Sequence, residues 1–113
     1  HLLVLYAGRS FIDDLLAAGA RVFELHSAMT HAKAVMIDST FATLGSANMD
    51  QRSFRLNFEG NIFFYGEEIT LQLEQDFQQL CKIAEEITPQ ARRQLGFKER
   101  LAESAARIMA PLL

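Results

Sequence analysis

The chain has 113 residues, half of them apolar, which is enough for one hydrophobic core but not for a second domain of similar size. Its formal net charge of −3 excludes a generally basic surface of the kind that binds nucleic acid by charge alone. The apolar runs are far shorter than the roughly 20 residues of a membrane-spanning helix. We therefore expect one soluble domain.

The N-terminal part predicts a strand-helix-strand unit. Residues 2–7 form an apolar run of strand length, and residues 11–18 follow as a short helix. Ser10 stands where an N-cap is expected, and Gly19 stands just past the last turn. Residues 21–25 then predict a second strand. Because the sequence opens inside a strand without a methionine, we interpret it as the C-terminal piece of a longer protein.

Further strands are predicted in the middle of the chain. Segments 31–37 and 41–46 have strand patterns, and the polar triplet 38–40 between them suits a tight turn, so we expect a hairpin. Residues 49–55 are polar and irregular, with room for one helical turn. Residues 57–65 alternate in polarity at first and predict a fifth strand.

The C-terminal part is predicted to be helical. From Glu67 the apolar period changes from two to about 3.6 residues, which indicates a helix that ends before Pro89. A last helix is predicted over 97–109. The expected fold class is α/β, a mixed β-sheet with flanking helices. The expected organisation is a single domain over residues 1–113, strand-rich and catalytic over 1–65 and helical over 67–113.

The predicted hairpin gathers polar side chains on one face. His31 and Lys33 project to the same side because side chains alternate along a strand. A two-residue loop at 39–40 sets Lys33 opposite Ser46. The same register sets His31 opposite Asn48. An imidazole, an ammonium, a hydroxyl and an amide in one patch can hold a phosphate group while the histidine reacts.

Two further observations concern this patch. Glu59 has the parity to lie beside it, where a carboxylate that accepts the second ring N–H of His31 would fix the tautomer of the imidazole. A metal site built from His26, His31 and Asp38 would conflict with a phosphate site that contains a lysine. We therefore expect neither a metal nor a cofactor.

This combination of residues resembles the phospholipase D superfamily, whose mark is a His-x-Lys motif with a following Asp and a Gly-Ser-x-Asn segment. The match is complete at His31, Lys33, Asp38, Gly45, Ser46 and Asn48. The surrounding stretches 30–33, 45–53 and 56–59, and the ending 110–113, are similar to the region of the second motif in bacterial cardiolipin synthases.

The resemblance implies half of an active site. In the family two such motifs meet, and one histidine attacks phosphorus to form a phosphohistidine while the other protonates the leaving alcohol. His31, in the second motif, is expected to be the general acid, and in a homodimer it could play either role. The other implied roles are phosphate binding by Lys33 and Asn48, assistance by Ser46, and orientation of the histidine by Glu59.

Asp38 receives two interpretations. The family motif counts it among the catalytic residues. The hairpin geometry instead places it at the turn, on the opposite pleat from His31, as a structural corner residue.

The leading functional prediction is phosphatidyl transfer of the cardiolipin synthase type, with phosphatidylglycerol as the phospholipid substrate. The other motif would come from a missing N-terminal half or from a second copy of the chain. We expect the parent protein at the bacterial cytoplasmic membrane, in contact with its surface. The chain alone is expected to be inactive unless it dimerises.

Three alternatives remain open. A phospholipase or a metal-independent nuclease of the same superfamily would use the same chemistry, and a non-catalytic interaction domain could descend from such an enzyme. Only Lys33, Arg52 and Arg55 are basic between residues 30 and 61, so nucleic acid is not the expected substrate. A non-catalytic descendant would be expected to have lost a motif residue, and none is lost.

The C-terminal helices combine basic and apolar residues, which is typical of a membrane-contacting face or of a solvated one. Glu99 and Glu103 interrupt the basic surface and favour the solvated face. The basic residues concerned are Arg92, Arg93, Lys98, Arg100 and Arg107.

Overall fold

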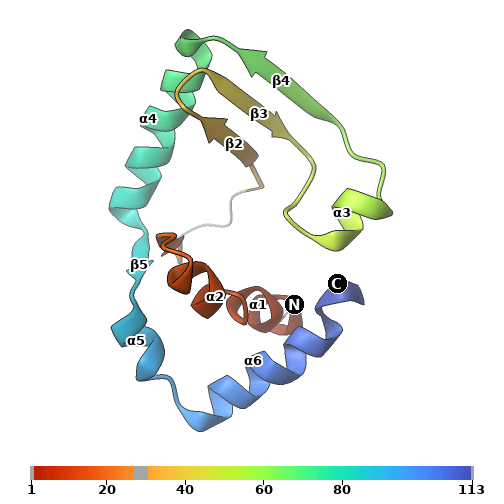
Figure 1. Cartoon of the computed structure of the whole chain (residues 1–113), viewed down its shortest axis with the longest axis vertical. Coiled ribbons are helices and arrows are strands. Elements are labelled where there is room, and N and C mark those ends of the chain that lie inside the picture. Colours follow the sequence, from red (N-terminus) through yellow and green to blue (C-terminus); the bar gives the residue numbers. More distant parts are fainter. Residues whose placement is uncertain (1, 27–30, 113) are drawn as a thin grey trace. The chain divides into compact units, whose positions relative to one another are not determined.

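The computed structural model describes residues 2–26 and 31–112, so Thr30 and Leu113 of the family-like stretches lie outside the described residues (Figure 1). The chain divides into two compact units. We call residues 1–24 and 85–113 the terminal unit and residues 25–84 the central unit. Within the described ranges the structure combines helices with two antiparallel sheets, which confirms the α/β class.

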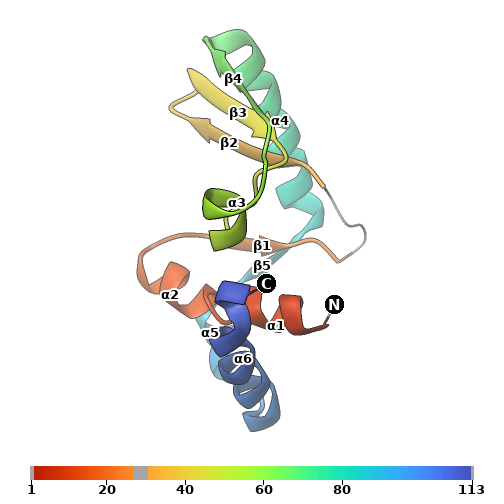
Figure 2. The same cartoon turned by 90° about the vertical axis from the view of Figure 1, so that its right-hand side faces the viewer.

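The terminal unit is mostly helical. Its two short strands pair antiparallel, and its first and last long helices pack against each other (Figure 2). Its elements are α1 (Leu2–Arg9), α2 (Ile12–Ala17), β1 (Val22–Glu24), β5 (Glu85–Ile87), α5 (Pro89–Arg93), α6 (Phe97–Met109) and the 3₁₀ helix η1 (Ala110–Leu112).

The strand predicted over 2–7 is wrong, because this segment forms α1. An apolar run without alternation fits a buried strand and a helix equally well, and leucine and alanine are good helix formers. The strand-helix-strand unit is therefore absent from the described residues, and β1 pairs with β5 instead. Ser10 does not cap α2, since its hydroxyl donates to the Ala7 carbonyl oxygen at 2.6 Å. Gly19 does end the helix region, with a φ of +87°.

The helix predicted to run from Glu67 to Pro89 is shorter than expected. It ends at Ile83, and β5 follows, with Ile87 opposite Val22. The residues of β5 are compatible with a helix by themselves, so the pairing with β1 decides their conformation. The helix predicted over 97–109 is confirmed as α6.

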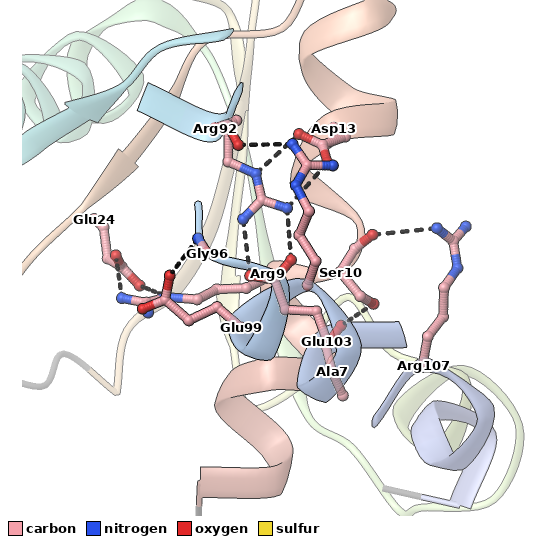
Figure 3. Close-up of polar contacts among 11 residues, drawn as sticks. Ala7, Arg9, Ser10, Asp13, Glu24, Arg92, Gly96, Glu99, Glu103 and Arg107 are labelled. Carbon is pink, nitrogen blue, oxygen red and sulfur yellow. Dashed lines mark hydrogen bonds and ion pairs between the residues drawn. The ribbon is translucent and has the colours of Figure 1, made fainter. Parts of the chain in front are cut away.

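A buried ion cluster holds three helices of the terminal unit together (Figure 3). Arg92 of α5 is only 6% exposed. Its guanidinium donates to both carboxylate oxygens of Asp13 in α2, at 2.8 and 3.1 Å. It also donates to both of Glu103 in α6, at 2.8 and 2.7 Å. The hydrogen bonds from Arg92 keep the pKa of Asp13 below its ordinary value.

This cluster corrects the expectation of a solvated basic face at Arg92 only, since the other four basic residues of the C-terminal helices are exposed. Arg92 points inward to its two carboxylate partners. Arg107 is tied to Asp14 by an ion pair of 2.7 Å and lies over the ring of Phe11. Arg100 donates to the Arg92 carbonyl oxygen at 2.8 Å. Three of the five basic residues are thus engaged within the unit, which leaves less free positive charge than the sequence indicated.

The central unit consists of a three-stranded antiparallel sheet in the order β2-β3-β4, together with α3 and α4. Helix α4 packs along the sheet and contacts all three strands (Figure 1). Ala42, in the middle strand, is completely buried. The bounds are β2 (Lys33–Ile37), β3 (Phe41–Gly45), α3 (Gln51–Arg55), β4 (Asn61–Tyr65) and α4 (Glu67–Ile83). The strand predicted over 57–65 therefore begins only at Asn61.

The hairpin is confirmed, but its predicted register is wrong by one residue. Ile37 pairs with Phe41, and Lys33 pairs with Gly45 rather than with Ser46. The loop has three residues, of which Asp38 and Ser39 adopt φ values of 50° and 54°. Aspartate tolerates this left-handed conformation better than most residues, and the sequence has no glycine there to specify a two-residue turn.

No helix of the described ranges is long and apolar enough to cross a membrane.

Candidate active site

His31 and Lys33 lie together at the open end of the hairpin. His31 is exposed and precedes β2, whereas Lys33 is the first residue of β2 and is half-buried. The Lys33 ammonium donates to the His31 carbonyl oxygen at 2.8 Å and lies 3.4 Å from the imidazole Nδ1. The structure therefore brings these two side chains together, as their spacing predicts.

Ser46 lies just past the end of β3, and its hydroxyl contacts the chain just before β4. It donates to Oε2 of Glu59 at 2.5 Å and accepts from the Gly60 backbone N–H at 3.1 Å. The backbone N–H of Ser46 also donates to the Gly60 carbonyl oxygen. Ser46 is thus positioned by the chain before β4, and not by the β2–β3 pairing from which we predicted its place.

Glu59 is the best-connected side chain of the site. Besides Ser46, it accepts hydrogen bonds from the Ser53 hydroxyl at 2.8 Å and from the Asn57 amide at 3.3 Å. The bond from Ser46, followed by that from Ser53, keeps the pKa of Glu59 below its ordinary value, and the charge of Lys33 adds to the effect. Glu59 is therefore ionised at neutral pH.

No hydrogen bond between Glu59 and His31 is present among the described residues, so the orienting role of Glu59 stays a prediction. Glu59 lies two residues before the start of β4, so strand parity does not determine its direction. The positive charge of Lys33 contributes to lowering the pKa of the Glu59 carboxylate.

Asn48 lies in the loop between β3 and α3, with an exposed side chain. Its backbone N–H donates to the Ser53 hydroxyl at 3.1 Å. Ser53 in turn is fixed by Asp50, the N-cap of α3, which accepts the Ser53 backbone N–H at 2.7 Å. Sequence reasoning missed Ser53 as part of the site, although Asp50, an aspartate before a short helical turn, is an N-cap signal.

Gly45 has a steric reason to be glycine. A Cβ atom at this position would overlap the Asn61 side chain and the Gly60 carbonyl oxygen. The backbone before β4 therefore approaches β3 more closely than any side chain permits. This close approach brings Glu59 within reach of Ser46.

Asp38 is the motif residue that the structure does not bring to the cluster. It lies exposed in the hairpin loop, at the other end of β2 from Lys33. Five residue steps along the extended strand place the two roughly 16 Å apart. The neighbouring Ser39 ties the same loop to α4 through Glu74, at 2.8 Å.

The cluster offers the groups that phosphodiester chemistry needs. His31 provides an exposed imidazole, and Lys33 and Asn48 provide hydrogen-bond donors for phosphate oxygens. The ionised Glu59 supplies a negative charge beside Ser46 and Ser53. Within residues 2–26 and 31–112, no group of three or more His, Cys, Asp or Glu side chains is placed to hold a metal ion.

Comparisons with known proteins identify the family of the chain. Residues 1–81 match the family described as "Cardiolipin synthase, PLD-like domain". Over 111 residues the chain is 40% identical to a cardiolipin synthase of Geobacillus kaustophilus, covering 98% of this chain and 22% of the relative. It is 40% identical over 110 residues to cardiolipin synthase 2 of Bacillus anthracis, covering 97% of this chain and 21% of the relative.

A third relative, a cardiolipin synthase of Clostridium perfringens, is 35% identical over 113 residues, which cover all of this chain and 24% of the relative. No solved structure matches the chain. The chain thus spans about a fifth of the length of the curated relatives that it matches. Since the family match extends over well more than half of its residues, the chain belongs to the PLD-like domain family of cardiolipin synthases.

Proposed function

We propose that this chain supplies one of the two catalytic motifs of a phosphatidyltransferase of the cardiolipin synthase type. The observation that carries the proposal is the group formed by His31, Lys33 and the Ser46–Glu59 pair at the open end of the hairpin. Membership of the family suggests the reaction in which this group takes part. Because His31 is exposed, its imidazole is accessible to a phosphodiester.

The substrate that fits is a phospholipid with a phosphodiester headgroup, and phosphatidylglycerol is our choice. One histidine of the complete site attacks phosphorus, and the bond from phosphorus to the glycerol oxygen breaks. The other histidine gives its proton to the departing glycerol. An alcohol group of a second lipid then attacks the phosphohistidine, loses its proton to the same base, and releases the first histidine.

His31 takes the acid and base part in this scheme, because it belongs to the second motif of the family. Lys33 and Asn48 bind the non-bridging oxygens of the phosphate. The hydroxyl hydrogen of Ser46 is engaged by Glu59, so Ser46 assists by holding that carboxylate. Glu59 stabilises the imidazolium form of His31 through its negative charge. Neither a metal ion nor a cofactor takes part.

The other motif comes from another part of a longer protein or from a second copy of this chain. The relatives are more than four times as long as the matched region, so they have room for a further motif within one chain. We propose that residues 1–113 form the catalytic half-domain that carries the second motif, with the chemistry in the segment 1–65 and helices over 67–113. The parent protein works at the bacterial cytoplasmic membrane, where its lipid substrates are.

The experiment uses the full-length parent protein, labelled phosphatidylglycerol and, separately, single-stranded DNA. We expect cardiolipin and free glycerol as products, with and without a chelator. His31→Ala should abolish the reaction, whereas His26→Ala, the same change outside the hairpin, should retain it. Phosphatidic acid as the sole lipid product would instead identify a phospholipase. Cleavage of DNA alone would identify a nuclease, and either result would overturn the proposal.

A further inference from the structure

Ser53 connects two parts of the candidate site through one hydroxyl group. It is only 8% exposed, and its Oγ accepts the backbone N–H of Asn48 at 3.1 Å while it donates to Oε1 of Glu59 at 2.8 Å. A serine hydroxyl has one hydrogen and can accept at the same time, so both bonds form together. The Asn48 backbone and the Glu59 carboxylate are thereby linked.

The position of Ser53 is itself fixed. Its backbone N–H donates to the side chain of Asp50 at 2.7 Å, which caps the first turn of α3. Helix α3 has five residues, far fewer than an isolated helix needs to be stable. Its place in the fold therefore depends on such contacts, and the linked pair Asp50 and Ser53 provides them.

Each oxygen of the Glu59 carboxylate receives a serine hydroxyl. Ser46 donates to Oε2 and Ser53 donates to Oε1, so the plane of the carboxylate is set by two groups on different segments. Asn57 adds a longer bond to Oε1, at 3.3 Å. Loss of Ser53 would leave one oxygen with only this longer contact.

We propose that Ser53 is a positioning residue of the site, which holds the phosphate-binding loop at Asn48 and the carboxylate of Glu59 in a fixed relation to each other. The catalytic consequence rests on the proposed function, whereas the positioning itself can be measured without any activity. Ser53 does not contact substrate in this scheme. It acts through the two residues that it holds.

The first test follows Glu59 and Asn48 by nuclear magnetic resonance in the 113-residue chain. In Ser53→Ala we expect the pKa of Glu59 to rise toward the ordinary carboxyl value and the Asn48 amide to exchange with solvent faster. Ser53→Thr, which keeps a hydroxyl, should restore both. Ser104→Ala, the same change at an exposed position of α6, should alter neither. Lys33, whose charge also acts on Glu59, is unchanged in all variants.

Ser53→Cys separates positioning from packing, because it fills the space but is a weak hydrogen-bond donor and acceptor. If Ser53→Ala does not fold, the Cys variant carries the test, and it should shift Glu59 and Asn48 in the same directions. A folded Ala or Cys variant in which the Glu59 titration and the Asn48 exchange rate equal those of the unchanged chain would overturn the proposal.

The second test measures phosphatidyl transfer by the full-length parent. Ser53→Ala should lower kcat by about tenfold to a hundredfold, as expected when a reacting group is slightly misplaced. KM should change less, and the acidic limb of the pH profile of kcat should move to higher pH. Restoration by Ser53→Thr is expected. If the unchanged parent shows no transfer, the proposed function fails, yet the resonance results still decide the role of Ser53.

Discussion

The terminal unit and the central unit use similar polar residues in opposite ways. In the terminal unit Arg92 is buried, and its guanidinium is shared between the carboxylates of Asp13 and Glu103. In the central unit the imidazole of His31 and the amide of Asn48 are exposed, and the carboxylate of Glu59 accepts hydrogen bonds from Ser46 and Ser53. The buried charges of the terminal unit therefore stabilise the fold, whereas the exposed groups of the central unit are accessible to a ligand.

The largest effect on stability is expected from breaking the ion cluster. Arg92→Met leaves the buried carboxylate of Glu103 without its partner, and we expect a loss of about 3–5 kcal/mol in the free energy of unfolding. Urea unfolding followed by circular dichroism measures it. Arg93→Met is the matched control, since Arg93 is exposed, and it should change stability by less than about 0.5 kcal/mol. Equal losses in the two variants would show that the cluster is not structural.

A smaller loss of stability is expected at Gly45, where the backbone before β4 approaches β3 closely. Gly45→Ala forces a Cβ atom against the Gly60 carbonyl oxygen and the Asn61 side chain, and we expect a loss of about 1–3 kcal/mol. The amide resonances of Ser46 and Gly60 should shift with it. At Gly60 a Cβ atom meets no atom within 4 Å, so Gly60→Ala is the control. A Gly45→Ala variant as stable as this control would refute the steric argument.

The smallest loss of stability is expected at Asp13, the exposed member of the ion cluster. The pKa of Asp13 is lowered in the folded state, so Asp13 contributes stability above its unfolded pKa of about 4, and this is lost as the pH falls through the folded value. The carboxylate is half exposed, so Asp13→Asn should cost only about 0.5–1 kcal/mol at pH 7.

The difference in free energy of unfolding between Asp13→Asn and the unchanged chain should shrink from pH 7 toward pH 3. Urea unfolding midpoints at pH 7 and pH 3 measure it. Asp76→Asn, an exposed change in α4, serves as the control. A difference for Asp13→Asn that grows as the pH falls would have the wrong sign for an ion pair with Arg92.

The sequence identified the two-strand hairpin and α6 because their patterns are local and unambiguous. It could not identify α1, since an apolar run such as 2–7 has no period that distinguishes strand from helix. It could not identify β5 either, because the conformation of 85–87 depends on pairing with β1, more than sixty residues earlier in the chain. Long-range pairing of this kind leaves no local signal.

At the site, the motif positions were predictable and their geometry was not. The register depended on a loop length that Asp38 and Ser39, without a glycine, do not specify. Ser46 and Asn48 also lie beyond the end of β3, where strand alternation no longer determines direction. The contact between Ser46 and Glu59 follows instead from the close approach of the backbone at Gly45, which becomes visible only in three dimensions.

The comparison of the two units is tested most directly by mapping where a phosphodiester binds. Glycerophosphoglycerol, the deacylated headgroup of phosphatidylglycerol, is titrated into the isotope-labelled 113-residue chain, and amide and side-chain resonances are followed. The account predicts saturable shifts at His31, Lys33 and Asn48, reduced in Lys33→Ala, and no saturable shift at Arg92 or Asp13. Saturable shifts confined to the terminal unit, or none at the hairpin, would contradict it.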